Sequence, residues 1–390
     1  MKILYISSVD VSLTKGPSAN EREFIPALYR LKGEKSHFLI PKPCNTLPKD
    51  IPVSACTFTK PHKERKPLDW IFHQVSVVRK TKKILSENSF DLIVIRADVF
   101  PFCYRYVTNK HGIPFAMKTA GSGEFKVFRR KNLLLKALKG LNQLFYNSLV
   151  SNAIYVDVVS PMQRNSLREI TGAGEKIQWI DNGVNIDRFK PADKKESKKK
   201  LQLEKFDPII GYAGNLPWKR GGMQIVQALP ELSKKYPNIG GVILGSGEGM
   251  QSLYDEARSL GVYERCVFTG QVDYNLVVDY INCMDVGISQ LNYDEQGASE
   301  QKVRQYLACG KPVIVSPGEV NQFISDKNLG YIVSHDDING FLKAIKSILD
   351  LSENEYDLIS KRSREYAENN LSFRSKVLER IEAWEKVLNR

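Results

Sequence analysis

Short apolar runs alternate with amphipathic segments through the second half of the chain. The runs predict buried strands over 209–213, 240–244, 265–269, 285–289 and 312–315. Between them, apolar residues recur three and four positions apart, which predicts helices over 221–235, 248–260, 274–282 and 300–308. Strands that alternate with helices indicate an α/β fold with a parallel, doubly wound sheet.

The first half shows the same alternation, and the two halves look like two copies of one architecture. We expect strands over 2–7, 37–40, 91–95, 115–118, 153–159 and 177–180. A helix is predicted to follow the first strand, with Ser18 as its cap and Glu21 at the spacing of a capping box. Ser160 and Pro161 predict the start of a later helix, because proline is tolerated in a first turn.

The length of the chain predicts more than one domain. At 390 residues the chain is too long for one ordinary core, so we expect two α/β domains. Residues 190–208 are charged and flanked by prolines, a composition typical of a linker. We therefore predict a first domain over 1–190 and a second over 206–370. A last helix over 371–390 is expected to pack back on the first domain.

The composition is that of a folded protein, with 42% hydrophobic and 26% charged residues. No apolar run is long enough to predict a membrane span, and the first residues lack the pattern of a signal peptide. The six cysteines are scattered without a C-x-x-C pair, which is typical of reduced thiols and not of a disulfide frame or a zinc site. We expect a cytoplasmic protein, with the inner face of the membrane as a second expected location.

The formal net charge of +13 predicts an anionic partner: nucleic acid, a membrane surface or a nucleotide substrate. No helix-turn-helix, zinc-finger or RNA-recognition signature is present, which argues against nucleic acid. Residues 129–146 predict a basic amphipathic helix of the kind that lies on anionic membranes. Its apolar face would hold Leu134, Leu138, Leu141 and Phe145. The alternative is that these side chains pack on the sheet and that the charges are solvated.

A basic, glycine-rich loop follows the predicted strand 209–213. Gly214 and Asn215 end the strand, and Lys219, Arg220 and two glycines lead into the next helix. Ligands of open α/β sheets bind at the carboxyl ends of the strands. The N–H groups at the start of a helix, together with two cations, therefore predict a phosphate or diphosphate site. The alternative is an ordinary loop with solvated charges.

Glycines and polar residues follow the neighbouring strands as well. Gly245 and Gly247 would allow a tight turn and the close approach of a ligand. Residues 271–273 follow the next strand, where backbone groups could contact a base. In the first half of the chain, residues 119–123 form a second flexible loop after a strand.

The predicted helix over 300–308 would direct its first N–H groups to the same edge. Ser299 is a good cap for this helix, and Lys302 and Arg304 add charge near its start. Gln305 could hydrogen-bond a hydroxyl group. The alternatives are a purely structural cap for Ser299 and a solvated charge for Arg304.

Several motifs stand in a specific order. They are IDNGVNIDRFKP at 180–191, the loop and helix over 214–228, LGSG at 244–247, VFTG at 267–270 and KVRQYLACGKPVI at 302–314. In this order and at this spacing they resemble the GT-B glycosyltransferases, specifically those of glycosyltransferase family 4. Asn185 stands where the corresponding family sequence has an aspartate.

The resemblance implies two Rossmann-like domains that face a central cleft, with a nucleotide-sugar donor mainly on the second. It implies retaining transfer from a UDP- or GDP-sugar to a glycan or a lipid-linked acceptor, in cell-surface polysaccharide biosynthesis. No metal or other cofactor is implied, because cationic loops and helix dipoles can stabilise the departing diphosphate.

The resemblance also implies residue roles. Arg220, or else Lys219, would contact the diphosphate, and Arg220 is favoured. The loop at Gly16 would close over the sugar, and Val272 would meet the base. Further donor-binding positions would be Gly214, Asn215, Gly245, Gly247, Ser299, Gln301, Lys302 and Gln305. Gly121 and Ser122 would lie on the acceptor side.

Three positions depart from the family pattern. The paired glutamates of the family would fall at Gly297 and Gln305, and Glu300 is the nearest carboxylate that could take the place of the first. Residues 119–121 stand where the family often has a histidine, and Asn215 where many relatives have arginine. A non-catalytic GT-B protein that binds nucleotide sugar or glycan is therefore the alternative function.

Overall fold

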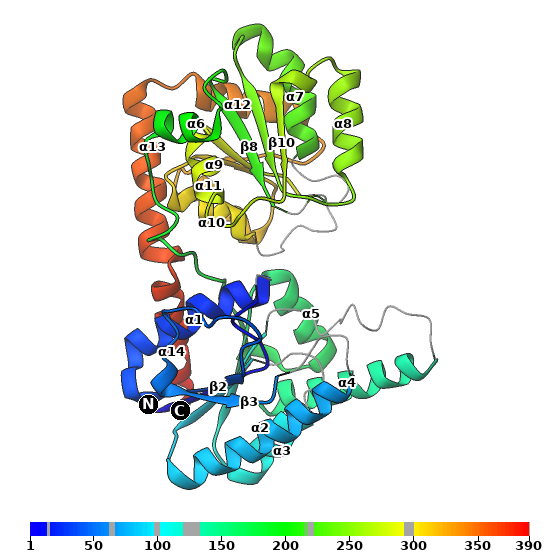
Figure 1. Cartoon of the computed structure of the whole chain (residues 1–390), viewed down its shortest axis with the longest axis vertical. Coiled ribbons are helices and arrows are strands. Elements are labelled where there is room, and N and C mark those ends of the chain that lie inside the picture. Colours follow the sequence, from blue (N-terminus) through cyan, green and yellow to red (C-terminus); the bar gives the residue numbers. More distant parts are fainter. Residues whose placement is uncertain are drawn as a thin grey trace. The chain divides into compact units, whose positions relative to one another are not determined.

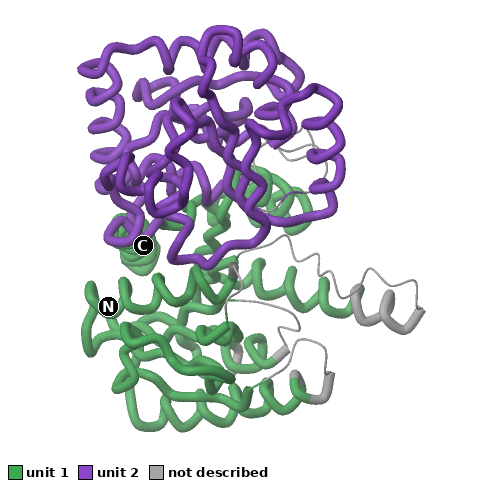
Figure 2. The backbone as a smooth tube through the Cα atoms, turned by 45° about the horizontal axis from the view of Figure 1, so that its top comes forward, with its two compact units in different colours: residues 1–183, 373–390 green, residues 184–372 purple. Residues whose placement is uncertain are grey.

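The structure, a computed structural model, describes residues 1–13, 16–61, 67–96, 102–119, 133–214, 216, 222–291 and 300–389. The chain divides into two compact units. Unit 1 comprises residues 1–183 and 373–390, and unit 2 comprises residues 184–372 (Figure 2). The sequence predicted the changes of domain at 190 and 371, whereas the units meet in the sequence at 183/184 and 372/373.

Unit 1 is built on a parallel sheet with the strand order β3-β2-β1-β4-β5-β6-β7. Its strands are β1 (Ile3–Ser7), β2 (Ser36–Pro41), β3 (Cys56–Thr59), β4 (Leu92–Arg96), β5 (Phe115–Lys118), β6 (Tyr155–Val158) and β7 (Ile177–Trp179). The strand β3 was not predicted from the sequence. It lies at the edge of the sheet and three of its four residues are only partly buried, so it has no continuous apolar run.

Helices cover both faces of this sheet (Figure 1). Along β1, Ile3 and Tyr5 pack in one core with α1 and α14, whereas Leu4 and Ile6 pack in another core with α2, α3 and α4. Successive side chains of a strand point to opposite faces, so an uninterrupted apolar strand feeds two cores. The helices are α1 (Gly16–Lys32), α2 (Pro67–Glu87), α3 (Phe102–His111), α4 (Leu133–Asn152), α5 (Pro161–Thr171) and α14 (Phe373–Leu388).

Unit 2 repeats the plan with the strand order β10-β9-β8-β11-β12-β13, again all parallel. The strands are β8 (Ile209–Ala213), β9 (Gly240–Leu244), β10 (Cys266–Gly270), β11 (Val286–Ser289), β12 (Val313–Val315) and β13 (Gly330–Ile332). Each strand predicted in this half is present, and the predictions for β8 and β9 agree residue for residue.

Two groups of helices pack on the two faces of the second sheet. One core joins the sheet to α7, α8 and α12, and the other joins it to α9, α10 and α11. The helices are α6 (Lys194–Leu201), α7 (Gly222–Lys235), α8 (Met250–Ser259), α9 (Val277–Cys283), α10 (Gln301–Ala308), α11 (Gln322–Asp326), α12 (Ile338–Leu349) and α13 (Glu353–Tyr366). Both sheets therefore have the doubly wound order that the alternation of strands and helices predicted.

Two local predictions are wrong. The helix α1 begins at Gly16, so Ser18 lies inside it and the expected capping box with Glu21 is absent. The carboxylate of Glu21 is instead buried against Tyr5 and Lys118. The expected linker over 190–208 contains the helix α6, which is capped by Asp193 and packs against α9 within unit 2. The predicted cap at Ser160 is confirmed, because its hydroxyl accepts a hydrogen bond from the N–H of Gln163.

The two crossings of the chain from one unit to the other are closely spaced. On the side of unit 1, a Cβ added to Gly183 would lie 2.4 Å from the Cα of Phe373, so only glycine fits there. On the side of unit 2, the N–H of Val184 donates to the carbonyl of Leu371 at 2.8 Å. None of the helices in the described ranges is both long and apolar enough to cross a membrane.

Candidate functional site

The order of the strands in unit 2 reverses between β8 and β11, the place where open α/β sheets bind ligands. The helix α10 is fixed across this place by Tyr306. Its buried hydroxyl accepts a hydrogen bond from the N–H of Ala213 at 2.7 Å, and lies 3.4 Å from the carbonyl oxygen of Ile288. Gly287 makes room for the ring, because a Cβ there would lie 2.4 Å from it. The ends of β8 and β11 therefore set the position of α10.

The glycines that follow β8 and β9 are required by close contacts between backbones. Gly245 has φ +123°, and a Cβ there would lie 1.8 Å from the carbonyl oxygen of Gly214. A Cβ on Gly247 would lie 2.1 Å from the carbonyl oxygen of Leu216. Hydrogen bonds from Gly214 to Leu244 and from Gly249 to Leu216 join the two loops. Packing between the two loops thus requires glycine at both positions, and the predicted contact of Gly245 and Gly247 with a ligand stays a prediction.

Lys302 lies over the end of β8. Its ammonium is 4.9 Å from the centre of the Tyr212 ring. A Cβ added to Gly214 would lie 3.0 Å from Cε of Lys302 and 3.7 Å from its Nζ. Within the described part of the chain, no carboxylate pairs with this ammonium. Its position beside Gly214 brings positive charge to the start of the predicted phosphate loop.

Glu300 is the residue before α10 and is buried, although its side chain does not cap the helix. One carboxylate oxygen accepts a hydrogen bond from the hydroxyl of Ser289, and the other accepts from Nδ2 of Asn321 at 3.0 Å. Nδ2 of Asn321 also donates to the carbonyl of Ser316 at 2.9 Å. Both oxygens of the candidate carboxylate are therefore held by the protein. Next to this cluster, Nε2 of the buried Gln290 has no hydrogen-bond partner among the residues that the structure describes.

The other candidates on α10 are more buried than the sequence predicted. Gln301 and Arg304 are within hydrogen-bond distance of each other, and burial lowers the pKa of Arg304 to about 9. A solvated charge was one of the two interpretations of Arg304, and its exposed fraction of 3% rules this out. Gln305 is also buried, on the same helix. Val272, two residues after β10, is partly buried against the core of unit 2.

Several predicted site residues lie outside the described part of the chain. These are Asn215, Lys219, Arg220 and Ser299 in unit 2 and Gly121 and Ser122 in unit 1. Their roles stay predictions. The N-cap position of α10 is occupied by Glu300 and not by Ser299, the expected cap.

Gly16, the predicted sugar-side residue of unit 1, is the first residue of α1. The segment after β1 is held by Asp10. One oxygen of this carboxylate accepts from the N–H and the hydroxyl of Ser12, and the other accepts from the N–H of Cys44 at 2.9 Å. The described part of this loop is therefore anchored to the segment after β2.

A buried network of charges lies at the carboxyl end of the sheet of unit 1. The carboxylate of Glu21 accepts hydrogen bonds of 2.7 Å from the Tyr5 hydroxyl and the Lys118 ammonium, and pairs with Arg96 at 3.1 Å. Burial alone would raise the pKa of Glu21, but the charges of Lys118 and Arg96 outweigh it and lower this pKa. Burial lowers the pKa of Lys118 to about 8.

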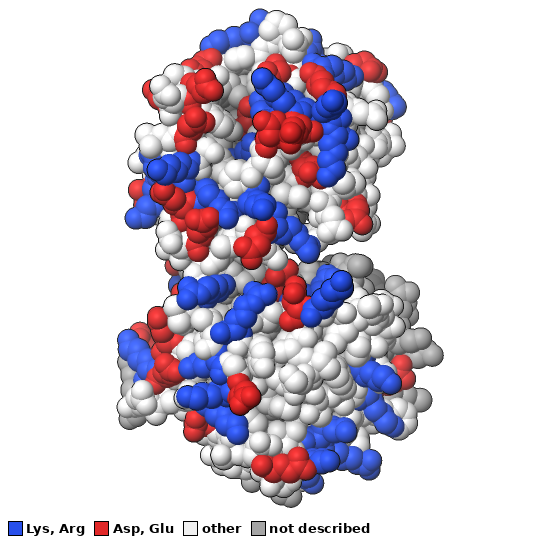
Figure 3. Space-filling model, turned by 60° about the vertical axis from the view of Figure 1, so that its left-hand side comes forward, with Lys and Arg blue, Asp and Glu red and all other residues white. Residues whose placement is uncertain are grey.

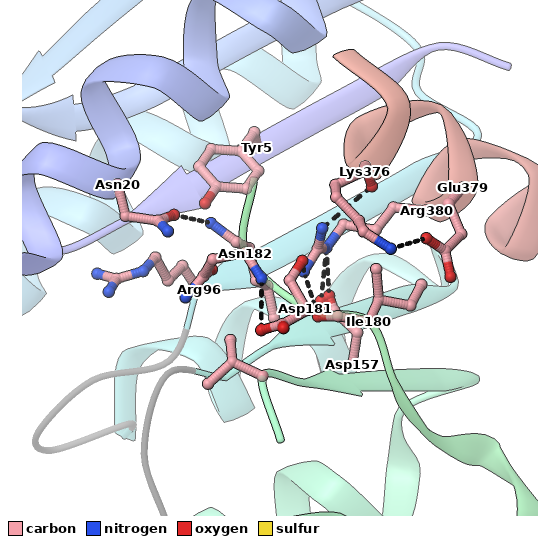
Figure 4. A network of polar contacts seen from close by, with 12 residues as sticks. Tyr5, Asn20, Arg96, Asp157, Ile180, Asp181, Asn182, Lys376, Glu379 and Arg380 are labelled. Carbon is pink, nitrogen blue, oxygen red and sulfur yellow. Dashed lines mark hydrogen bonds and ion pairs between the residues drawn. The ribbon is translucent and has the colours of Figure 1, made fainter. Parts of the chain in front are cut away.

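A second ion pair ties α14 to the same sheet. Figure 4 shows Arg380 of α14 pointing to Asp157 of β6 and to the chain at Ile180 and Asp181. Nε of Arg380 is 2.9 and 3.1 Å from the two oxygens of Asp157, and NH2 donates to both carbonyls. Burial raises the pKa of Asp157, and the charge of Arg380 offsets part of this shift.

The sequence analysis did not predict this network. A signal was present, because Arg96 and Lys118 end apolar strands and Asp157 lies inside one, positions at which a charge must be buried and paired. Nothing in the sequence indicates that Glu21 and Arg380 are the partners.

Residues 193–366 match the family model of the glycosyl transferases group 1. This segment of the chain is therefore similar to the glycosyl transferases group 1. The matched segment lies within unit 2 and includes the ends of β8 to β12, with α10 and the Glu300 cluster.

A curated relative is similar to part of the chain. The GDP-mannose-dependent alpha-(1-6)-phosphatidylinositol monomannoside mannosyltransferase of Mycolicibacterium smegmatis is 25% identical over 205 residues, which are 51% of this chain and 54% of the relative. The chain thus spans about half the length of the curated relatives it matches.

Solved structures resemble the whole chain. A glycosyltransferase from Rickettsia africae has a TM-score of 0.74 at 20% identity, over 100% of this chain and 99% of the other. Anabaena HepE, solved in complex with UDP-glucose, has a TM-score of 0.69 at 15% identity, over 99% of this chain and 100% of the other. The two-sheet architecture of the chain is the GT-B fold.

Asn185 lies before the matched segment and can do the local work of the aspartate that the resembled sequences have at this position. Its Oδ1 accepts from the N–H groups of Asp187 and Arg188 at 3.1 and 2.9 Å, an Asx turn that needs only a side-chain oxygen. The three carbonyls of Ile186, Phe189 and Ala308 all accept from NH1 of Arg364. The segment after residue 184 is therefore joined to α10 and α13 within unit 2.

The surface charge and the titratable side chains indicate whether the protein could bind nucleic acid or a metal ion. On the face that Figure 3 shows, basic and acidic side chains are interspersed and do not form one broad basic field, which gives no support to a nucleic-acid surface. Across the ranges that the structure describes, His, Cys, Asp and Glu form no group of three that could hold a metal ion.

Proposed function

We propose that the protein is a retaining glycosyltransferase that moves a sugar from a nucleotide-sugar donor to a glycan or lipid-linked acceptor. The observation that carries this proposal is the position of the group 1 match. It covers the strand ends at which Gly214, Lys302 and the start of α10 come together. This place is the reversal of strand order, where doubly wound sheets bind nucleotides.

The donor diphosphate would lie between the starts of α7 and α10. Both helix starts offer N–H groups and the positive end of a helix dipole. Lys302 adds an ammonium, and Arg220, with Lys219 as the alternative, would add a further cation from the loop before α7. Positive charge supplied in this way can stabilise the leaving diphosphate without a metal ion. We expect transfer to continue in the presence of excess EDTA, measured as release of nucleoside diphosphate.

The donor would be a UDP- or GDP-sugar. The name of the mycobacterial relative gives GDP-mannose as its donor, and the Anabaena protein was solved with UDP-glucose. The test is a thermal-shift screen with UDP, GDP, ADP, CMP and dTDP. A nucleotide that binds only the folded protein raises the unfolding temperature.

The screen is repeated on Arg220→Ala. We expect one nucleotide to stabilise the wild-type protein and to lose most of its effect on this variant. Lys219→Ala is the matched control for the register of the loop and should reduce the shift less. A larger loss with Lys219→Ala would exchange the roles of the two residues.

Transfer itself is tested with the nucleotide sugar that the screen selects. Release of nucleoside diphosphate in the presence of acceptor measures turnover, and the anomeric configuration of the product, determined by NMR, tests retention. Binding without transfer or hydrolysis under any condition would favour the alternative, a non-catalytic GT-B protein. That alternative has a specific basis: Gln305, at the position of the second family glutamate, is neutral.

A lipid-linked acceptor would be reached from a membrane surface, in cell-surface polysaccharide assembly. The support is α4, where Leu144 and Leu141 are 67% and 45% exposed in place of packing on the sheet. Of the predicted apolar face, Leu141 is exposed and Phe145 is partly buried, and the side chains at 133–139 lie outside the described ones. The relative's name, with phosphatidylinositol monomannoside in it, gives further support.

Membrane contact is tested by flotation with vesicles that contain anionic lipid. Wild-type protein should float with them, and Leu144→Glu should float less, because an exposed leucine contributes about 1.5–3 kcal/mol when it leaves water. Leu358→Glu, at another exposed leucine on α13, is the matched control and should float like the wild type. Equal flotation of all three proteins would exclude α4 as the contact.

A further inference from the structure

We propose that Glu300 is a positioning residue that, together with Ser289 and Asn321, places Lys302 against the diphosphate of the donor. The proposal deepens the proposed function and rests on it. It also gives Glu300 a different role from the one inferred by resemblance, in which this carboxylate would reach the donor sugar.

The first step of the argument is the saturation of the carboxylate. Ser289 ends β11, and Asn321 ends the short 3₁₀ turn η7 (Glu319–Asn321) that follows β12. Each donates a hydrogen bond to a different oxygen of Glu300. Both donors are buried, as is Glu300 itself, so the carboxylate joins three segments and faces protein groups on both oxygens.

The second step is the mechanical link from Glu300 to Lys302. Glu300 is the N-cap residue of α10, and Lys302 is the second residue of the helix. Tyr306 holds the middle of the same helix to the ends of β8 and β11. The helix α10 is thus held at Glu300 and at Tyr306. These two contacts fix the direction in which the side chain of Lys302 leaves the helix. The contacts of Glu300 are the ones that tie the N-cap of the helix to β11 and to η7.

The third step is the place that Lys302 reaches. Its ammonium lies over Tyr212 and next to Gly214, at the end of β8. The ordinary role of a buried charged cluster would be stability alone. Stability alone does not account for the position of Lys302. Its ammonium has no carboxylate partner among the described residues and lies at the start of the predicted phosphate loop.

The chain offers a matched control in Asn282. Like Asn321 it is a buried asparagine of unit 2 whose side chain makes two hydrogen bonds to other segments, to the carbonyl of Lys190 and the N–H of Ala192. It lies in α9, just before β11 begins, and so at the opposite edge of the sheet. Asn282→Ala should therefore cost comparable stability without touching the diphosphate.

The experiment is a double-mutant cycle on the affinity for nucleoside diphosphate, measured by calorimetry with the UDP or GDP that stabilises the wild type. Asn321→Ala and Lys302→Ala should each weaken binding by about tenfold, the effect of losing or misplacing one charge-assisted contact. The combined variant should be scarcely weaker than Lys302→Ala, because both substitutions remove the same contact. Asn282→Ala should bind like the wild type.

The affinity for the corresponding nucleoside monophosphate is measured as well. The ratio of the two affinities would not change through a loss of stability alone. Asn321→Ala should lower the ratio of diphosphate to monophosphate affinity, whereas general damage to the domain would weaken both nucleotides alike. Glu300→Gln should retain more affinity than Glu300→Ala, because a glutamine can accept from Asn321 and donate to the hydroxyl of Ser289.

The outcomes separate the two proposals. Wild-type protein that binds none of the nucleotides overturns the proposed function and this inference with it. Wild-type protein that binds, together with additive effects of Asn321→Ala and Lys302→Ala, overturns the inference alone. Glu300→Gln that keeps full diphosphate affinity but loses transfer would also overturn it, since that result is expected of a carboxylate in contact with the sugar.

Discussion

The two sheets of this protein end in different ways at the edge where doubly wound sheets bind ligands. In unit 1, charged residues end or occupy the strands β4, β5 and β6, and Glu21 and Arg380 pair with them from helices. In unit 2, glycines follow β8 and β9, a serine ends β11, and one carboxylate is held by neutral donors. Among the described residues, the same topology thus supports a network of paired buried charges in one unit, and glycines with a neutrally held carboxylate and an unpaired lysine in the other.

The comparison separates charges that are paired within the protein from a charge that has no carboxylate partner among the described residues. Lys118 and Arg380 are buried and paired, and their contacts join α1 and α14 to the sheet. Lys302 is only partly buried and pairs with no carboxylate in the described ranges. Burying a charge is expensive unless it is paired, so paired buried charges are weak evidence for function. The edge of unit 2 is accordingly the better candidate for a donor diphosphate.

The largest expected effect is on the paired edge of unit 1. Arg380→Ala leaves Asp157 buried without its partner and two carbonyls without their donor, which should lower the free energy of unfolding by about 3–5 kcal/mol. Urea denaturation followed by circular dichroism measures this. Arg374→Ala, an exposed arginine on the same helix, is the control and should change stability by less than about 0.5 kcal/mol. Equal losses of stability in Arg380→Ala and Arg374→Ala would contradict the proposed contrast between the edges of the two sheets.

The next effect concerns the glycine edge of unit 2. Gly245→Ala would place a Cβ 1.8 Å from a backbone oxygen at φ +123°, and should lower the free energy of unfolding by at least about 2 kcal/mol. Gly270→Ala is the matched control. Its φ is +64° and no described atom lies within 4 Å of the added Cβ. The left-handed conformation alone should therefore lower the free energy of unfolding, by about 1 kcal/mol. The same denaturation experiments measure both variants. A smaller loss of stability in Gly245→Ala than in Gly270→Ala would argue against close packing of the two loops.

The smallest effect is on the dependence of stability on pH. The pKa of Lys118 is about 8 in the folded protein and 10.5 for an unperturbed lysine, so between these values the unfolded chain binds more protons. Raising the pH through this range therefore favours the folded state. Relative to Lys118→Met, the wild type should gain on the order of 1 kcal/mol between about pH 7.5 and 9.5.

The control for the pH series is Lys83→Met, which removes an exposed lysine of α2. The difference in stability between this variant and the wild type should stay constant over the same range of pH. If the difference in stability between Lys118→Met and the wild type also stayed constant, the ammonium of Lys118 would not lose its proton in this range of pH. Burial would then lower the pKa of Lys118 less than its position in the structure indicates.

Most of the fold could be predicted from local patterns. Uninterrupted apolar runs such as β8 and β9 predicted the strands, because a strand buried on both faces has no polar positions. The prediction missed β3, whose partly exposed residues give no such run. It also placed a linker where the lysine-rich α6 forms, because charge on one face of a surface helix and charge in a linker look alike in composition.

The motifs indicated where a candidate site would lie, and that location stays a prediction, but they did not indicate the contacts that the structure shows there. The order of the motifs led to the ends of β8, β9 and α10, and the group 1 match covers these elements. The role of Glu300 could not be inferred, since its partners are 11 and 21 residues away and are ordinary serine and asparagine residues. The capping box at Ser18 and Glu21 was wrong for the same reason, as Glu21 pairs with a lysine 97 residues away.

The sequence by itself determined the two parallel sheets and the edge of the second at which glycines and cations gather. These features depend on apolar periodicity and on residues close together in the chain. Only the tertiary structure decided which polar groups meet. The pairs Glu21 with Lys118, Asp157 with Arg380 and Glu300 with Asn321 arise when elements distant in the chain pack together, and a buried charge takes the partner that packing brings within reach.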